Sequence, residues 1–272
     1  GGCWMMKRAT LWLSSIAVAA LMAGANAQVI IYQTSFEGFA TGSINGQDGW
    51  ANGSGGGASQ SIVNTFARTG SQSLFWDNTG ALNSFYSVRR SFNGQAGAIT
   101  PITPLEASVW IHVNPGTGAD RLYGIYLTNS GTGTLGSTVL GATISGDGGF
   151  RAGTTWGATY SSTALYTNPA LVGSWVRVVL RYDGTGGSAA VYDASDTLLF
   201  STNFDTVSLG GANGTGTNSW NVNLGSDYIT TTNRAGSAYM DDLRIWVVPE
   251  PASMVALGAG LVGLLGLRRR KK

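Results

Sequence analysis

The residues of this sequence that could do chemistry are few and lie far apart in a glycine-rich chain. Glu106 opens a stretch in which Ser108, Trp110 and His112 share its parity, so a strand there would carry an acid, an aromatic ring and an imidazole on one face. Glycoside hydrolysis usually needs two carboxylates at a defined separation. No Glu-x-Asp-x-x-Glu run supplies them, so the sequence assigns no catalytic residue.

His112 is the only histidine, and this limits the remaining reaction classes. A Ser/His/Asp arrangement would have to use His112, but no Gly-x-Ser-x-Gly elbow is present. A zinc site needs three or four nitrogen or sulfur ligands, and the only cysteine, Cys3, lies at the extreme N-terminus. Thiol, disulfide and zinc chemistry are therefore not expected, and calcium, which takes oxygen ligands, is the metal that the composition allows.

Aromatic residues are the second kind of candidate, because exposed rings stack on sugars. Outward parity marks Trp110 and His112, with Arg177 and Arg181 as neighbours on another strand. The further candidates, expected on loops, are Trp50, the pair Trp156 and Tyr160, and the pair Trp220 and Tyr228. The alternative for each tryptophan is that it fills the core or caps an edge of the fold.

The elements that must position these residues are strands. Between residues 28 and 248 apolar residues alternate with polar ones, and no window keeps a helical spacing. The expected strands are residues 29–36, 59–66, 72–76, 83–92, 105–113, 122–128, 137–144, 175–182, 189–192 and 197–201. Residues 38–57 are expected to form a loop, and residues 147–149 a tight turn. Many short strands separated by glycine turns predict an all-β protein, an antiparallel two-sheet β-sandwich.

Three stretches of this region resemble the concanavalin A-like (laminin-G-like) jelly-roll domains and related carbohydrate-binding modules. They are GSWVRVVLRYD at 173–183, SFEG at 35–38 and YMDDLRI at 239–245. In the related binding modules a structural calcium ion joins the first and last strands. The resemblance therefore implies a calcium site at Glu37 and Asp241, with Asp242 as the alternative. The other interpretation is an acid that is hydrogen-bonded or paired with Arg234 or Arg244.

The C-terminus combines three features: Pro249-Glu250-Pro251, an uncharged apolar run over 252–267, and five cations at 268–272. The apolar run would span roughly 24 Å as a helix, a little short of a ~30 Å hydrocarbon core. Together the features resemble the PEP-CTERM sorting signal of exported bacterial proteins. The resemblance implies processing by an exosortase and an association with exopolysaccharide and biofilm production. The alternative is a plain C-terminal membrane anchor.

The N-terminus predicts export as well. Lys7 and Arg8 precede an apolar stretch over 11–22, and Ala25-Asn26-Ala27 is a cleavage pattern for signal peptidase. The expected organisation is a signal peptide at 1–27, in which residues 1–4 are upstream translation, a β-sandwich domain at 28–247 and a sorting tail at 248–272. A signal helix and a transmembrane helix would flank the sandwich.

The charge of the exported part argues against nucleic acid as a partner. The chain has a formal net charge of +2, but seven of its sixteen cations lie in the two targeting segments. Glu250 also lies in the C-terminal segment, so nine arginines then face thirteen acids, a net charge of −4.

These observations predict an exported protein that is tethered to the inner membrane and then released or displayed at the surface. The predicted role is non-catalytic, with exopolysaccharide as the candidate ligand. One alternative is a polysaccharide lyase or hydrolase with an atypical site, in which Glu106, His112 and an arginine would converge. The other is a structural or adhesive protein with a protein ligand.

Overall fold

The computed structural model describes residues 29–53, 59–80, 85–92, 99–160, 163–209 and 219–248. Within it, Ile30–Trp246 forms one compact unit. The predicted signal peptide, the two predicted flanking helices and the sorting tail from Pro249 onward lie outside the described residues.

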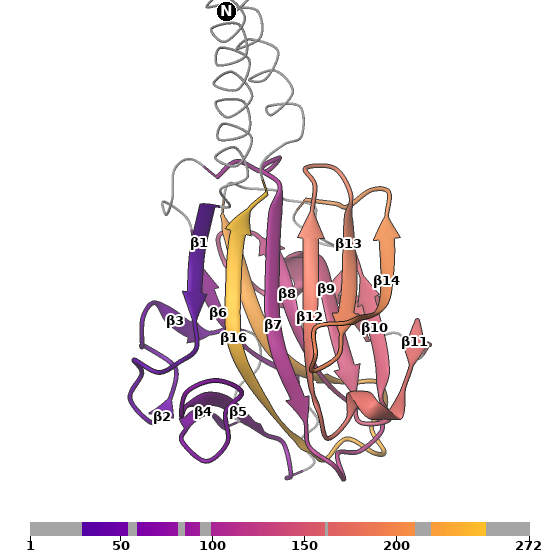
Figure 1. Ribbon diagram of the computed structural model, residues 1–272. Helices are drawn as coiled ribbons and strands as arrows, with labels where there is room; N and C mark the ends of the chain where they lie inside the picture. Colours follow the sequence, from indigo (N-terminus) through magenta and orange to yellow (C-terminus); the bar gives the residue numbers. More distant parts are fainter. Residues whose placement is uncertain are drawn as a thin grey trace, which may run out of the picture. The chain divides into compact units, whose positions relative to one another are not determined.

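The compact unit is a sandwich of two antiparallel sheets (Figure 1). The nine-stranded sheet has the order β14 (Leu198–Phe204), β13 (Gly187–Tyr192), β12 (Trp175–Tyr182), β7 (Leu105–Val113), β16 (Ser237–Val247), β5 (Ser73–Asp77), β4 (Ser59–Val63) and β2 (Gly42–Ser43), and β1 (Val29–Thr34) pairs with β16. The seven-stranded sheet has the order β11 (Tyr166–Thr167), β10 (Gly149–Gly153), β9 (Thr138–Ser145), β8 (Arg121–Asn129), β15 (Trp220–Tyr228), β6 (Tyr86–Ser91) and β3 (Trp50–Asn52). The described helices are short: η1 (Leu135–Ser137), α2 (Trp156–Thr159) and η2 (Pro169–Leu171).

The core lies between the sheets, where β7 and β12 contact β8 and β9. Val178 and Leu180 of β12 are buried on the inner face, as the alternation of the sequence predicts. Trp220 is fully buried against the ring of Tyr182, with ring centroids 5.2 Å apart. Such interlocking of large side chains between two sheets supplies most of the apolar burial that stabilises the domain.

The predicted all-β, two-sheet sandwich is confirmed, but five of its strands were not expected. The structure forms β2, β3 and β15 where loops were expected, and it forms β11 where no strand was predicted. β10 starts at the expected turn and continues the chain as a strand. All residues of β15 but the last are buried, although Asn221 and Asn223 have low strand propensity. The polar residues of β15 are paired on both sides, with β6 and with β8, so tertiary pairing overrides their propensity.

Candidate functional site

The candidate site is a groove of about 670 Å³ on the outer face of the nine-stranded sheet. Arg68, Arg177 and Arg244 line it, and we call it the arginine groove. Its other lining residues are Gln33, Thr34, Ser35, Glu37, Gly38, Thr69, Ser108, Trp110, Asp196, Asp242, Leu243 and Trp246. The groove thus combines two tryptophans with three guanidinium groups.

Strand pairing places Trp110 beside Arg177. In the antiparallel pair of β7 and β12, Arg177 is opposite Trp110 and Val179 is opposite Ser108. Both strands turn their apolar residues inward, so Trp110 and Arg177 lie on the outer face. The two residues that the sequence marked as outward neighbours are therefore direct cross-strand partners.

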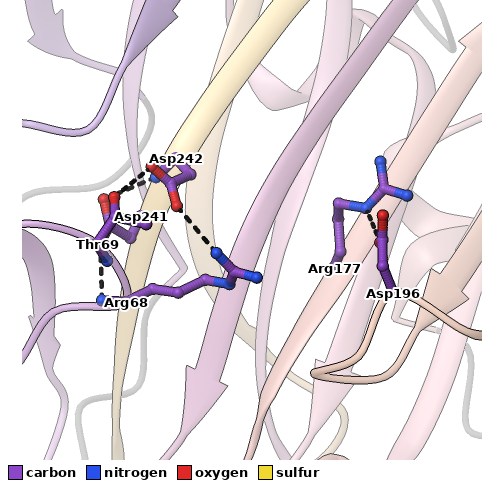
Figure 2. Close-up of polar contacts among 6 residues, drawn as sticks. All are labelled: Arg68, Thr69, Arg177, Asp196, Asp241 and Asp242. Atoms are coloured by element: carbon purple, nitrogen blue, oxygen red, sulfur yellow. Dashed lines mark hydrogen bonds and ion pairs between the residues drawn. The ribbon is translucent and has the colours of Figure 1, made fainter.

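Arg177 is held in place by an aromatic ring and a carboxylate. Its guanidinium carbon lies 4.5 Å from the centre of the Tyr192 ring on β13. Its Nε donates to Asp196 Oδ1 at 2.7 Å (Figure 2). Asp196 belongs to the turn after β13, where Asp193 Oδ1 accepts from the backbone nitrogens of Ser195 and Thr197. These contacts fix one edge of the guanidinium and leave its Nη atoms directed elsewhere.

Arg68 makes a similar cluster on the other side of the groove. Its guanidinium carbon lies 3.5 Å from the centre of the Trp110 ring, so the ring of Trp110 is covered and only 6% of the residue is exposed. Arg68 Nη1 lies 3.5 Å from Asp242 Oδ2, and Thr69 Oγ1 donates to Asp242 Oδ1 at 2.7 Å (Figure 2). The stacking surface of Trp110 is occupied by arginine in this structure.

The segment that carries Arg68 is anchored by two further acids. Asp241 Oδ2 accepts from the backbone nitrogens of Arg68 and Thr69 at 2.9 and 3.1 Å. At the other end of the segment, Glu37 Oε1 accepts from the backbone nitrogens of Ser71 and Gln72, both at 2.7 Å. These carboxylates hold residues 68–72 over the outer face of the sheet.

Burial and hydrogen bonding move the pKa values of the two anchoring acids in opposite directions. Burial raises the pKa of Asp241 to about 6, against the lowering effect of the amide of Thr69. The amides of Gln72 and Ser71 lower the pKa of the exposed Glu37. Asp241 is fully buried because β16 changes phase there: Met240 and Leu243 are both buried, and Asp242 between them has φ +49°.

The predicted calcium ligands Glu37, Asp241 and Asp242 therefore do not form one open carboxylate cluster. Glu37 and Asp241 bind opposite ends of residues 68–72, and their oxygens accept backbone N–H groups. Among the described residues, no group of three or more His, Cys, Asp and Glu side chains is arranged to hold a metal ion. The backbone N–H groups that bind these carboxylates fit a role in organising the loop. A calcium site stays a prediction.

His112 lies next to the arginine groove in a cluster of rings. Phe66 contacts the rings of His112 and Tyr239 with centroids 4.8 and 4.9 Å apart, and it stacks on Trp175 at 5.5 Å. Burial lowers the pKa of His112. His112 Nδ1 is 3.1 Å from Asn114 Oδ1, so this polar contact is with the residue that directly follows β7.

The atypical enzyme site would need Glu106 and His112 together, and the structure separates them. They lie six residues apart on the same strand, which is a distance of roughly 20 Å at 3.3 Å per residue. Arg181 is opposite Glu106 on β12. Burial raises the pKa of Glu106, while Arg181 and Arg177 oppose the shift. No catalytic convergence of these side chains exists.

Trp156, Tyr160 and Trp220 lie away from the arginine groove. Trp156 Nε1 donates to Asp227 Oδ2 of β15 at 2.6 Å, and its ring contacts Tyr160 at 5.5 Å. These two residues therefore belong to the side of the seven-stranded sheet, where Tyr160 borders a second hollow of about 740 Å³. Trp220 is fully buried, so it packs the core and offers no surface to a ligand.

Sequence reasoning did not single out the partners that shape the groove. Arg68, Tyr192, Asp196 and Trp246 come from turns, a loop and strand ends. Outward parity on β16 could have indicated Arg244, which is exposed. The contacts of Arg68 with Asp242 join residues 174 positions apart, and no local pattern encodes them.

Three solved structures are similar in shape to this chain. The CBM2 module of the evolved Dit of Lactobacillus casei BL23 phage J-1 is 9% identical, with a TM-score of 0.50, and the match covers 82% of this chain and 97% of that one. A cellulose induced protein is 14% identical, with a TM-score of 0.49, over 79% and 96% of the two chains. The endo-beta-1,4-glucuronan lyase of the fungus Trichoderma reesei is 11% identical, with a TM-score of 0.48, over 80% and 95%. At these identities the likeness to the phage module shows the fold alone.

No curated protein matches the sequence. In the described part of the chain, no helix is long and apolar enough to cross a membrane. Residues 247–271 match the PEP-CTERM protein-sorting motif. This motif implies export, processing by an exosortase and association with the cell surface.

Proposed function

We propose that this protein is a non-catalytic, polysaccharide-binding component of the cell surface or extracellular matrix, and that the arginine groove is its binding site. The sorting motif supports a location outside the cytoplasm, first tethered to the inner membrane and then at the surface. Exopolysaccharide is the polymer that a protein sorted in this way would meet.

The observation that carries the proposal is the composition of the groove. Sugar-binding sites combine aromatic rings with a few fixed polar groups. Trp110 and Trp246 line the arginine groove, but both are buried, so Arg177, which Tyr192 and Asp196 hold in place, is the fixed polar group open to a ligand. Stacked and ion-paired side chains lose little freedom on binding, so their donors are preorganised for hydroxyl and carboxylate oxygens.

The test measures binding of the purified full chain, in detergent, to a panel of immobilised polysaccharides: dextran, xylan, curdlan, xanthan and alginate. We expect at least one immobilised polymer to retain the protein, and we expect Arg177→Ala to weaken that retention. Arg181→Ala is the matched control, because Arg181 lies on the same strand and face but does not line the groove. The proposal would be contradicted if no polymer retained the protein, or if the two variants lost equal amounts of binding.

A further inference from the structure

We infer that the arginine groove selects acidic polysaccharides by binding their carboxylate groups, an inference that rests on the proposed function and narrows it. The hydrogen-bond donors that line the groove determine this selectivity. A guanidinium has five N–H donors in a planar fork that matches a carboxylate. The donors that the protein itself leaves unused are therefore the ones available to a ligand.

Arg177 offers the larger part of its fork. Only its Nε is engaged, by Asp196 Oδ1, and its two Nη atoms have no hydrogen-bond partner among the described residues. The stacking on Tyr192 and the bond to Asp196 keep the guanidinium in one orientation. Figure 2 shows the two Nη atoms directed away from the Asp196 carboxylate. Arg177 is thus a fixed, half-satisfied anion receptor.

Arg68 and Arg244 add donors to the same groove. Arg68 uses only Nη1 in its side-chain contacts, at the long distance of 3.5 Å from Asp242 Oδ2. Arg244 is exposed, and its guanidinium makes no hydrogen bond to the residues that the structure describes. Three guanidinium groups from a loop, β12 and β16 thus present free N–H groups to one groove of about 670 Å³.

The acids in the groove do not cancel this excess of donors, because each is already oriented on a partner. Glu37 accepts three bonds from Ser71 and Gln72. Asp242 accepts from Thr69 Oγ1 and Arg68 Nη1. Asp196 accepts from Arg177. A neutral sugar would leave most of the arginine donors to water, whereas a carboxylate would satisfy them with charge-assisted bonds.

The charge of the remaining surface makes the groove a local feature. Outside the targeting segments the chain carries nine arginines against thirteen acids, and three of the nine line this groove. A general attraction to polyanions is not expected from a net charge of −4. Binding of an acidic polymer must therefore depend on the groove residues themselves.

The experiment compares one polymer with and without its carboxylates. The full chain in detergent is titrated with alginate, with the same alginate after reduction of its carboxyl groups to hydroxymethyl groups, and with dextran sulfate, at about 150 mM salt. We expect alginate to bind at least about 10-fold more tightly than the reduced polymer, as charge-assisted bonds imply. We expect Arg177→Gln to remove most of that difference.

Matched variants separate the geometry of the site from its charge. Arg181→Gln removes a cation from the same strand and should leave alginate affinity unchanged. Arg177→Lys keeps the charge but loses the fork, so its affinity should fall between the wild type and Arg177→Gln. Circular dichroism and thermal melting of each variant establish that the fold is retained. If Arg181→Gln lowers affinity as much as Arg177→Gln does, the binding is non-specific and the inference fails.

The outcomes distinguish this inference from the proposed function. Equal, Arg177-dependent binding of alginate and reduced alginate would overturn the carboxylate selectivity and leave polysaccharide binding intact. Tighter binding of dextran sulfate than of alginate would also overturn it, because the recognised group would not be a carboxylate. Failure of every polymer in both panels would overturn the proposed function and this inference together.

Discussion

Asp196 and Asp242 hold two of the three guanidinium groups of the groove from the same backbone conformation. Their φ angles are +68° and +49°, in the left-handed region that few residues other than glycine adopt. Asp196 pairs with Arg177, and Asp242 pairs with Arg68. Each of these arginines also stacks on an aromatic ring. Aspartate tolerates the left-handed conformation better than most residues, so a single residue can both turn the backbone and orient a cation.

A third cluster with the same composition lies elsewhere in the domain. Arg90 stacks on Tyr32 at 3.8 Å and pairs with Asp48 at 3.3 Å, and Asp48 has φ +43°. Each of these three ion pairs therefore joins an arginine on a ring to an aspartate with positive φ. Tyr32 also donates to Asp48 Oδ2 at 2.8 Å, and Arg90 is buried, so this copy stabilises the fold and leaves no donors for a ligand. The arginine groove differs from this cluster because the side chains of its paired arginines, Arg68 and Arg177, are partly exposed.

The conformation of Asp242 gives a test of its structural role. Asp242→Ala loses the contacts with Thr69 and Arg68 and keeps an unfavourable φ, whereas Asp242→Gly loses the same contacts without the strain. We expect the alanine variant to be about 1 kcal/mol less stable than the glycine variant. Asp242→Asn, which tolerates the conformation and still accepts from Thr69, should be the most stable of the three. Urea denaturation checks the order, and equal midpoints for alanine and glycine would contradict it.

Trp220 and Trp175 allow a comparison of how much a core and an outer-face tryptophan contribute to stability. Because it is fully buried against Tyr182, Trp220→Ala should lower the free energy of unfolding by about 3–5 kcal/mol. Trp175→Ala, at a half-buried position on the outer face, should cost less than about 2 kcal/mol. Chemical denaturation compares the two. A larger loss for Trp175→Ala would place the main packing role on the outer face.

Calcium binding at Glu37 and Asp241 is tested by melting temperature. A calcium ion that binds only the folded state at 100 times its dissociation constant adds about 2.7 kcal/mol of stability. The prediction is therefore a melting temperature several degrees higher in calcium than in EGTA, with the difference removed by Glu37→Gln. An unchanged melting temperature would leave the amides of residues 68–72 as the partners of both acids.

The sandwich could be predicted because its strands alternate visibly. In β12 the apolar residues Val176, Val178 and Leu180 are separated by arginine and valine, and the structure buries the apolar set as expected. β15 could not be predicted in the same way. Both of its faces are covered, so the asparagines that interrupt its apolar residues do not mark a solvent-facing side.

The site was predictable only where it depends on strand parity. Trp110 and Arg177 lie on the outward positions of adjacent strands, and the sequence indicates both. The covering of Trp110 by Arg68 depends on contacts between a loop and the last strand. Contacts of this range follow from how the chain packs and leave no periodic signal in the sequence.

Stability should fall as pH rises through the weakly acidic range. Burial raises the pKa of both Asp227 and Asp241 to about 6, above the value near 3.9 expected in the unfolded chain. Because the unfolded state loses its protons first, each acid destabilises the fold progressively between about pH 4 and pH 6, by at most about 3 kcal/mol. Below this range the lowered pKa of Glu37 and Asp193 acts in the opposite direction, and their stabilising bonds are lost on protonation. Denaturation from pH 3 to 8 should therefore show a maximum near pH 4.

The variant that tests this assignment is Asp227→Asn, whose amide oxygen can still accept from Trp156 Nε1. It should flatten the decline between pH 4 and pH 6 by about the contribution of one group. Asp205→Asn is the control, because Asp205 is an exposed residue with no side-chain hydrogen bond among the described contacts. An Asp227→Asn profile that parallels the wild type would show that Asp227 does not titrate in this range.

Gly70 tests whether Glu37 anchors the segment that covers Trp110. Gly70 has φ +64°, and a Cβ added there would overlap the carboxyl group of Glu37. Gly70→Ala should therefore strain the backbone and also displace Glu37 from the amides of Ser71 and Gln72. Gly46→Ala is the matched control, because Gly46 has φ +88° and no atom within 4 Å of the added Cβ. The strain alone should cost each variant about 1 kcal/mol.

The difference between the two glycine variants isolates the displacement of the carboxylate. We expect Gly70→Ala to lose more stability than Gly46→Ala and to exchange the amide hydrogens of Ser71 and Gln72 faster. Arg68 should then leave the Trp110 ring more often, because the segment that carries it has lost one of its two anchors. Hydrogen exchange resolved to residues 68–72 measures this directly. Protection of those amides that is the same in both variants would show that Asp241 and Asp242 hold the segment without Glu37.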